Sequence, residues 1–168
     1  MLSLDLDPTF SPSRAVMAGA TAAVAYVGIM YADMAITGSP TNELLMLGRP
    51  LTADRTKALL VGLAAHMGVG TAMGVIYGAV GRRRLPGPDW ARGVLMMLME
   101  NTILWPAALV IDRVHPSMRS GELPRLNTPV SVAQQIARHS GFGAVMGALY
   151  GDGSGTLERI RRPPDGGH

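Results

Sequence analysis

The segment HMGVGTAMGVIYG at residues 66–78 returns as HSGFGAVMGALYG at residues 139–151. Seven of the thirteen positions are identical, and they include a histidine and a tyrosine that stand eleven residues apart in both copies. Chance rarely produces such a match, so we interpret the two segments as an internal duplication. The duplication predicts an architecture in which one structural unit occurs twice.

The composition around these segments is that of a membrane protein. Of the 168 residues, 48% are hydrophobic and only 16% are charged, whereas soluble domains carry about 25% charged residues. The chain has no cysteine, which excludes disulfides and thiol chemistry. Its net charge is +3, but the arginines cluster at the ends of apolar stretches. We therefore expect the lipid bilayer as the partner and no binding of nucleic acid.

Four apolar stretches are long enough to cross a bilayer as helices. Helix-start signals precede them, namely Ser11-Pro12, Thr52 or Asp54, Asp89 and Thr128-Pro129. The sequence predicts helices at residues 14–36, 55–80, 90–111 and 129–151, and a disordered cytoplasmic tail at 152–168. The predicted fold is all-α: a single integral-membrane four-helix bundle made of two tandem helical hairpins in the same orientation.

Basic residues indicate the orientation of the bundle. The densest cluster, Arg82 to Arg84, lies in the shortest predicted loop, where the positive-inside bias is strongest. Residues 1–10 contain no lysine or arginine and so lack the positive region of a signal peptide. We predict a multi-pass protein with this basic turn and both termini in the cytoplasm.

Several polar residues are predicted to lie at one depth in the bilayer. His66 and His139 each precede the last glycine of their motif by twelve residues. Glu100 and Asn101 lie about ten residues into the third helix, and Arg138 adjoins His139. Ionisable groups in a membrane interior are costly unless paired, so we expect these five residues to meet, with Glu100 and Arg138 as an ion pair.

Asp33 is a further acidic residue, near the end of the first helix. It could lie at the membrane interface, or it could be a polar group at the mouth of a cavity.

The two motifs predict a distinctive helix face. Their histidines and tyrosines fall on the same side of a helix because eleven residues are nearly a whole number of turns. Small-xxx-small glycine ladders run beside them, which favours close contact between the second and fourth helices. The motif residues are Gly70, Gly74, Tyr77, Gly143, Gly147 and Tyr150. We expect the two tyrosines at equivalent positions near the inner interface.

Three functions remain open, and we favour a non-catalytic structural or accessory membrane subunit that self-associates or joins other membrane subunits and needs no cofactor. A second is a small transporter or proton-linked channel that uses the polar cluster. A third is an electron carrier with His66 and His139 as axial ligands of a b-type haem. A site in which histidine and carboxylate bind a metal is a minor option. Signatures of hydrolases, kinases and dinucleotide-binding enzymes are absent, which disfavours an enzyme.

The motif also invites a family comparison. The pattern His-x-Gly-x-Gly-x-x-x-Gly-x-x-Tyr-Gly at residues 66–78 and 139–151, set in four helices, resembles small bacterial inner-membrane proteins of the YagU-like kind. The resemblance covers chiefly the second and fourth helices. The resemblance supports the four-helix fold alone and implies no reaction. We expect the protein in the bacterial inner membrane.

Overall fold

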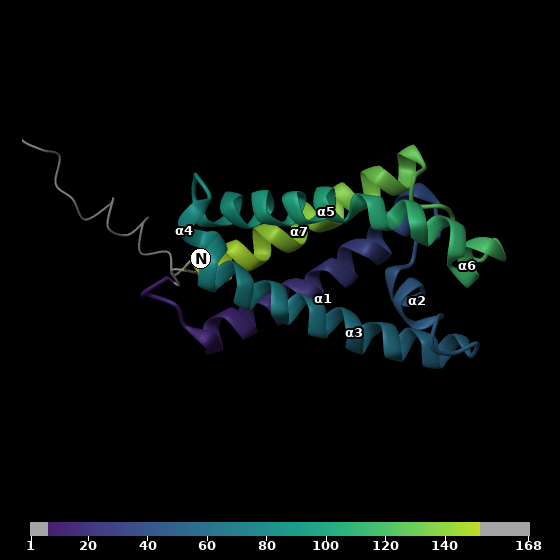
Figure 1. Ribbon diagram of the computed structural model, residues 1–168, viewed down its shortest axis with the longest axis horizontal. Coiled ribbons are helices and arrows are strands. Elements are labelled where there is room, and N and C mark those ends of the chain that lie inside the picture. Colours follow the sequence, from purple (N-terminus) through teal and green to yellow (C-terminus); the bar gives the residue numbers. More distant parts are fainter. Residues whose placement is uncertain (1–6, 152–168) are drawn as a thin grey trace, which may run out of the picture.

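The computed structural model describes residues 7–151, and every regular element in that part of the chain is a helix. The long helices are α1 (Pro12–Thr37), α3 (Arg55–Ile76), α5 (Asp89–Val114) and α7 (Pro129–Tyr150). Figure 1 shows them lying along the long axis of the molecule, with α5 and α7 above α1 and α3. Shorter elements connect them: α2 (Glu43–Gly48), the π-helical turn η1 (Tyr77–Gly81), α4 (Arg82–Arg84) and α6 (Pro116–Arg119). The predicted all-α class is confirmed.

Within residues 7–151, three helical stretches are long and apolar enough to cross a membrane. They are Pro12–Thr37, Arg55–Arg84 and Asp89–Val114, with mean hydropathies of 1.6, 1.8 and 1.8. Large apolar side chains are exposed along them, as at Leu60 and Ile103, where lipid would surround them. α7 is more polar because Gln134, Gln135 and Arg138 lie on its buried face.

The helix starts follow the predicted signals. Asp54 accepts a hydrogen bond from the amide of Lys57 at 2.8 Å, and Thr128 accepts one from Ser131 at 3.2 Å, so each caps the first turn of its helix. Asp54, not Thr52, is thus the cap of α3. Asp89 is the first residue of α5, whose N-cap position is occupied by Pro88.

Glycines bring the backbones of neighbouring helices into direct contact. A Cβ on Gly74 in α3 would collide with the backbone of Ala15 and Gly19 in α1. A Cβ on Gly143 in α7 would collide in the same way with the backbone of Gly93 in α5. Small residues allow this approach in a membrane bundle, where close packing stabilises helix pairs.

The predicted close contact of the second helix with the fourth is therefore wrong for most of their length. α3 packs against α1, α7 packs against α5, and α1 joins the two hairpins by packing against α7. The glycine ladders serve contacts within each hairpin, because the facing helices also offer small residues such as Gly19 and Gly93. α7 approaches α3 where Phe142 lies beside Gly70, and it meets η1 at the end of the bundle, where Tyr150 covers Gly78.

The basic segment after α3 also differs from its prediction as a non-helical turn. η1 inserts a wider π-helical turn, after which Arg82–Arg84 continues as helix. The break comes at Leu85, whose backbone is extended (ψ 140). Leu85 precedes Pro86, and a residue before proline is disfavoured in the helical conformation. The predicted tail at 152–168 lies outside the described residues.

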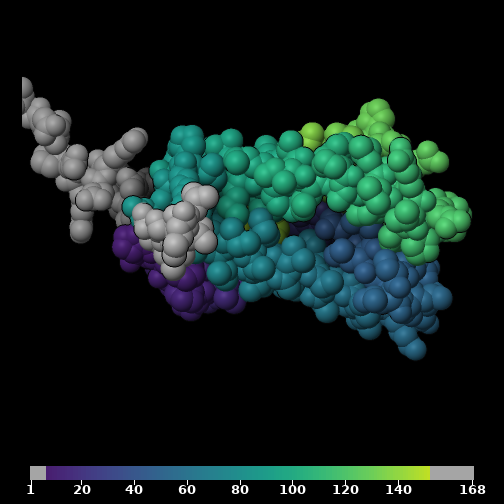
Figure 2. Space-filling view, viewed as in Figure 1, coloured from purple at the N-terminus to yellow at the C-terminus, as the bar shows by residue number. Residues whose placement is uncertain are grey.

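α2 lies beside the first half of α3. A Cβ on Gly48 would collide with the backbone of Ala58, and one on Gly62 with the backbone of Leu44. Gly62 is the eighth residue of α3, about 10 Å from its start. α2 therefore packs closely on α3, with Leu44, Leu45 and Gly48 buried. Figure 2 shows the surface hollowed between α5, in green, and α3 with α2, in blue.

Candidate functional site

The polar residues inside the bundle form two neighbouring groups. The first group joins α1 to α7 through Arg138, whose side chain is fully buried. Its Nε and Nη2 atoms each donate to a carboxylate oxygen of Asp33 at 2.6 Å, and its Nη1 donates to the carbonyl of Thr41 at 2.8 Å. Gln134 donates to the same carboxylate at 2.7 Å. This group ties the end of α1 to α7, and within residues 7–151 the Oε1 atom of Gln134 is its one buried side-chain atom without a hydrogen-bond partner.

The predicted pairing of Glu100 with Arg138 is thus wrong. Arg138 faces α1, where Asp33 provides a bidentate partner, the geometry in which guanidinium and carboxylate bind best. Asp33 lies one turn before the end of α1, and its side chain is 15% exposed and paired with Arg138.

The second group begins at α2. Asn42 caps this helix by accepting from Leu45 at 3.0 Å, which leaves Glu43 as its first residue. The Glu43 carboxylate accepts a hydrogen bond from the hydroxyl of Tyr26 in α1. Its Oε1 atom lies 3.6 Å from Nδ1 of His66 in α3. The Tyr26 hydroxyl is also 3.2 Å from Oε1 of Gln135 in α7.

His139 and Glu100 extend this group from α7 to α5. Nε2 of His139 lies 3.4 Å from Oε2 of Glu100. That Glu100 oxygen is buried and has no hydrogen-bond partner within the described residues. The ring of Tyr26 lies between the two halves of the group, with its centroid 4.8 Å from that of His66 and 5.6 Å from that of His139.

Each histidine has one nitrogen committed to the backbone. Nε2 of His66 is 3.2 Å from the carbonyl of Ala23, and Nδ1 of His139 is 2.8 Å from the carbonyl of Gln135. A carbonyl only accepts, so these nitrogens carry hydrogen. The other nitrogen of each ring faces a carboxyl group, and that contact is favourable only when a proton lies on one of the two partners. Each carboxylate–imidazole pair therefore has its two facing atoms placed to share one proton.

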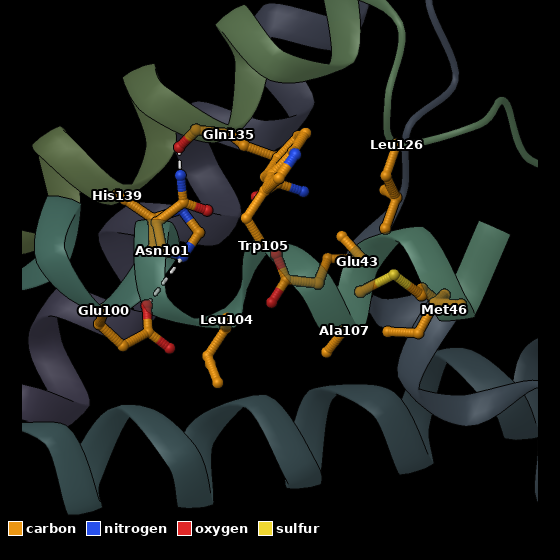
Figure 3. A pocket seen from close by; sticks show the side chains of 12 residues that line it. Glu43, Met46, Glu100, Asn101, Leu104, Trp105, Ala107, Leu126, Gln135 and His139 are labelled. Atoms are coloured by element: carbon orange, nitrogen blue, oxygen red, sulfur yellow. Dashed lines mark hydrogen bonds and ion pairs between the residues drawn. The ribbon is translucent and has the colours of Figure 1, made fainter.

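Both carboxylates line a cavity of about 200 Å³, which we call the Glu100 cavity. Figure 3 shows His139 between Glu100 and Gln135, with Glu43 and Trp105 further along the cavity. Residues from α2, α5, α7 and the loop before α7 surround it: Glu43, Met46, Glu100, Asn101, Leu104, Trp105, Ala107, Ala108, Ile111, Leu126, Gln135 and His139. The cavity combines two carboxyl groups, two side-chain amides and an aromatic ring with apolar walls.

The structure thus divides the five residues expected to meet. Glu100, Asn101 and His139 lie together on the Glu100 cavity. His66 joins the same group behind Glu43. Arg138 belongs to the other network.

The tyrosines of the repeated motif lie at the opposite end of the bundle. Tyr77 and Tyr150 are both buried and meet edge to face, with ring centroids 5.9 Å apart. The Tyr77 hydroxyl donates to the carbonyl of Asp89 at 2.9 Å, and the Tyr150 hydroxyl accepts from the amide of Ser11 at 3.1 Å. The tyrosine of each motif is therefore hydrogen-bonded to the start of the first helix in the other hairpin.

These residues do not fit a bis-histidine haem. Axial ligation needs a free nitrogen on each imidazole and open space between the rings. Here His66 and His139 each hold one carbonyl and face one carboxyl group, and the Tyr26 ring packs against both. Among residues 7–151, no three or more histidine, aspartate or glutamate side chains are grouped to hold a metal ion.

Sequence reasoning missed Tyr26 and Glu43 in this group. Glu43 lies in a loop segment of the sequence, and only the docking of α2 on Gly62 carries it to the level of His66. Tyr26 is one aromatic residue in a long apolar run. Its position seven residues before Asp33, hence on the same helix face, was the available signal.

The fold and this site define an α-helical protein with membrane-length apolar helices and a polar, titratable interior. The chain belongs to the DUF6789 family, a family of unknown function whose model matches residues 11–159. No curated protein and no solved structure matches the chain.

Proposed function

We propose that the protein is a small membrane carrier that exchanges a small organic cation for protons at the Glu100 cavity. The observation that carries this proposal is the Glu100 side chain: its buried Oε2 atom has no hydrogen-bond partner among residues 7–151, and it lies on the wall of a cavity, 3.4 Å from Nε2 of His139. An unsatisfied carboxylate is costly in a membrane interior. A cation or a proton at this oxygen removes that cost.

The lining of the cavity favours a cation as the solute. Glu43 and Glu100 supply two acidic groups, and Trp105 supplies an aromatic ring of the kind whose face attracts cations. Leu104 and Ala107 supply apolar surface for an alkyl body. At about 200 Å³ the cavity is smaller than the roughly 300–1,000 Å³ of drug-sized sites, so the solute is a compact one.

Protons and the cation compete for the same carboxylates, so their movements across the membrane are coupled in opposite directions. Each carboxylate–imidazole pair holds one proton when the cavity has no cation. A cation bound beside Glu43 and Glu100 favours the ionised carboxylates and releases those protons. Exchange of cation for protons therefore follows from the site itself.

Flux through reconstituted protein tests the proposal. Proteoliposomes containing a pH-sensitive dye receive external tetramethylammonium or guanidinium, two cations that stay charged. We expect the internal pH to rise faster than in protein-free vesicles. Glu100→Gln should abolish most of this response, and Glu43→Gln should weaken it.

Glu122→Gln is the matched control, because Glu122 lies in the loop after α6 and does not line the Glu100 cavity. It should retain the wild-type response. Wild-type vesicles that respond to neither cation faster than protein-free vesicles would refute the carrier.

The non-catalytic accessory subunit is the second candidate. The Asp33–Arg138 network favours it, because that network is hydrogen-bonded within the protein and stabilises the bundle without facing a solute. A folded protein without cation flux that co-purifies with another membrane subunit would support this role.

We also propose the membrane arrangement in its finer detail: α7 is a fourth span, the hairpins are tandem repeats in one orientation, and both termini are in the cytoplasm of a bacterial cell. The equivalent contacts of Gly19 with Gly74 and of Gly93 with Gly147 support the repeat. Arg82 to Arg84 supports the orientation. A reporter fused after Gly151 should be active only on the inner side of the membrane.

We also propose that the protein self-associates, since exposed apolar side chains cover α1, α3 and α5. Cross-linking in the membrane tests this self-association. The proposed likeness to YagU-like proteins rests on the repeated motif.

A further inference from the structure

A second pocket lies at the end of the molecule away from η1, where α5 ends and the chain leads to α7. Its volume is about 550 Å³. Three arginines from different segments line it: Arg113 at the end of α5, Arg119 at the end of α6, and Arg125 in the following loop. We call it the arginine pocket.

The three guanidinium groups are available for a ligand. All three residues are exposed, and within residues 7–151 none of their side chains forms a hydrogen bond or ion pair. The pocket's carboxylate, Asp112, is already committed, since it accepts from the amides of Leu126 at 2.6 Å and Asn127 at 3.1 Å. Asp112 thereby fixes the loop that carries Arg125.

The three arginines of the pocket favour the binding of an anion with several acceptor oxygens. Three like charges around one pocket repel one another, and each guanidinium is a fork of donors suited to phosphate oxygens. A single phosphate group has enough oxygens to accept from all three.

The surroundings of the pocket indicate where that phosphate comes from. Leu109 also lines the pocket, and its side chain is 42% exposed on α5, a helix apolar enough to cross a membrane. The arginines therefore lie where the apolar layer gives way to headgroups, with an apolar surface directly beside them for an acyl chain.

We propose that the arginine pocket binds the phosphate of an anionic phospholipid. A net negative headgroup is favoured over a zwitterionic one, because the arginines would repel a headgroup amine. The site shares no residue with the Glu100 cavity, so it is independent of the proposed transport.

Binding of defined lipids to the full-length protein in non-ionic detergent tests the site. Short-chain phosphatidylglycerol, phosphatidylcholine with the same chains, and inorganic phosphate are the three probes, titrated calorimetrically. We expect phosphatidylglycerol to bind tightest. Arg119→Gln and Arg125→Gln should each raise its Kd about tenfold, the usual effect of losing a charged hydrogen bond.

Arg84→Gln is the matched control, since it removes an exposed positive charge at the opposite end. It should leave the Kd unchanged, and all variants should keep the melting temperature of the wild type. Equal binding of phosphatidylglycerol by wild type and by the triple variant Arg113→Gln/Arg119→Gln/Arg125→Gln would overturn the site. Inorganic phosphate that competes as well as the lipid would overturn the lipid as its occupant.

Discussion

Arg138 holds Asp33 through two charged hydrogen bonds of 2.6 Å each, across 105 residues of sequence. The arginine is fully buried, so Asp33 takes the place of water around a charge that would otherwise be unsatisfied inside the protein. It fixes α7 against α1 at the end of the bundle where α2 begins.

Removing one partner of this pair should destabilise the protein more than removing both. Asp33→Leu and Arg138→Leu should each cost about 1–2 kcal/mol in detergent, because each leaves an uncompensated buried group. The double variant should recover part of the loss. Glu100→Leu combined with Arg138→Leu is the control cycle, and its effects should add because these side chains do not meet. Thermal melts measure all five variants.

The glycines between the helices should not tolerate even a methyl group. Gly74→Ala and Gly147→Ala place a Cβ against the backbone of α1 and α5 respectively, and such overpacking costs about 1–3 kcal/mol. Gly28→Ala is the control, because nothing lies within 4 Å of a Cβ there. If Gly28→Ala lowers the melting temperature as much as Gly74→Ala does, the close helix contact is not the cause.

The two motif tyrosines should contribute equally. Tyr77→Phe and Tyr150→Phe each remove one hydrogen bond between the hairpins, worth about 0.5–1.5 kcal/mol. Tyr31→Phe should be neutral, since Tyr31 is 47% exposed. The measurement is the melting temperature of each variant, and a large difference between the two motif variants would contradict their equivalence.

The stability of the loops at one end of the bundle should depend on pH because of Glu122. Its hydrogen bond from Arg49 holds the pKa of the carboxyl below its ordinary value of 4.5, with further contacts from Ser117 at 2.9 Å and Arg55 at 3.1 Å. Because the folded pKa is depressed, the stabilisation is complete above the ordinary pKa and is lost as pH falls through the folded value.

Melts of wild type and Glu122→Gln should therefore differ at neutral pH, by less than about 1 kcal/mol for so accessible a pair. The difference should shrink progressively below pH about 4.5. A difference that stays constant down to strongly acidic pH would assign the effect to packing instead of charge.

The helices could be predicted from sequence because local signals determine them. Hydropathy marked the apolar runs, and Asp54 and Thr128 cap the helices they were expected to start. The continuation of helix through Arg82–Arg84 was missed because a π-helical turn leaves no distinctive pattern in composition.

The candidate site could be predicted only in part. The level of a residue follows from its position along one helix, whereas the residue it contacts depends on how several helices pack together. Counting residues along a helix brings Glu100 and His139 to one level, and they do lie 3.4 Å apart. Arg138 is at a similar level but turns to Asp33 because the rotation of α7 is set by its glycine contacts with α5. Tyr26 and Glu43 could not be predicted as part of the site, because they meet only when α2 docks on α3. No periodic pattern in the sequence predicts that docking.

The crossed tyrosines have a consequence for the topology of the chain. Tyr150, near the end of the described residues, bonds to Ser11, near their beginning, just as Tyr77 bonds to Asp89 across the middle of the chain. The four long helices therefore form a closed circuit in which the last element returns to the first. A polypeptide opened between α4 and α5, with residues 151 and 7 joined by a linker, should keep the hydrogen bond from Asp7 to Ala79 and the same helix neighbours. The order in which the hairpins are synthesised is then not part of what the fold requires.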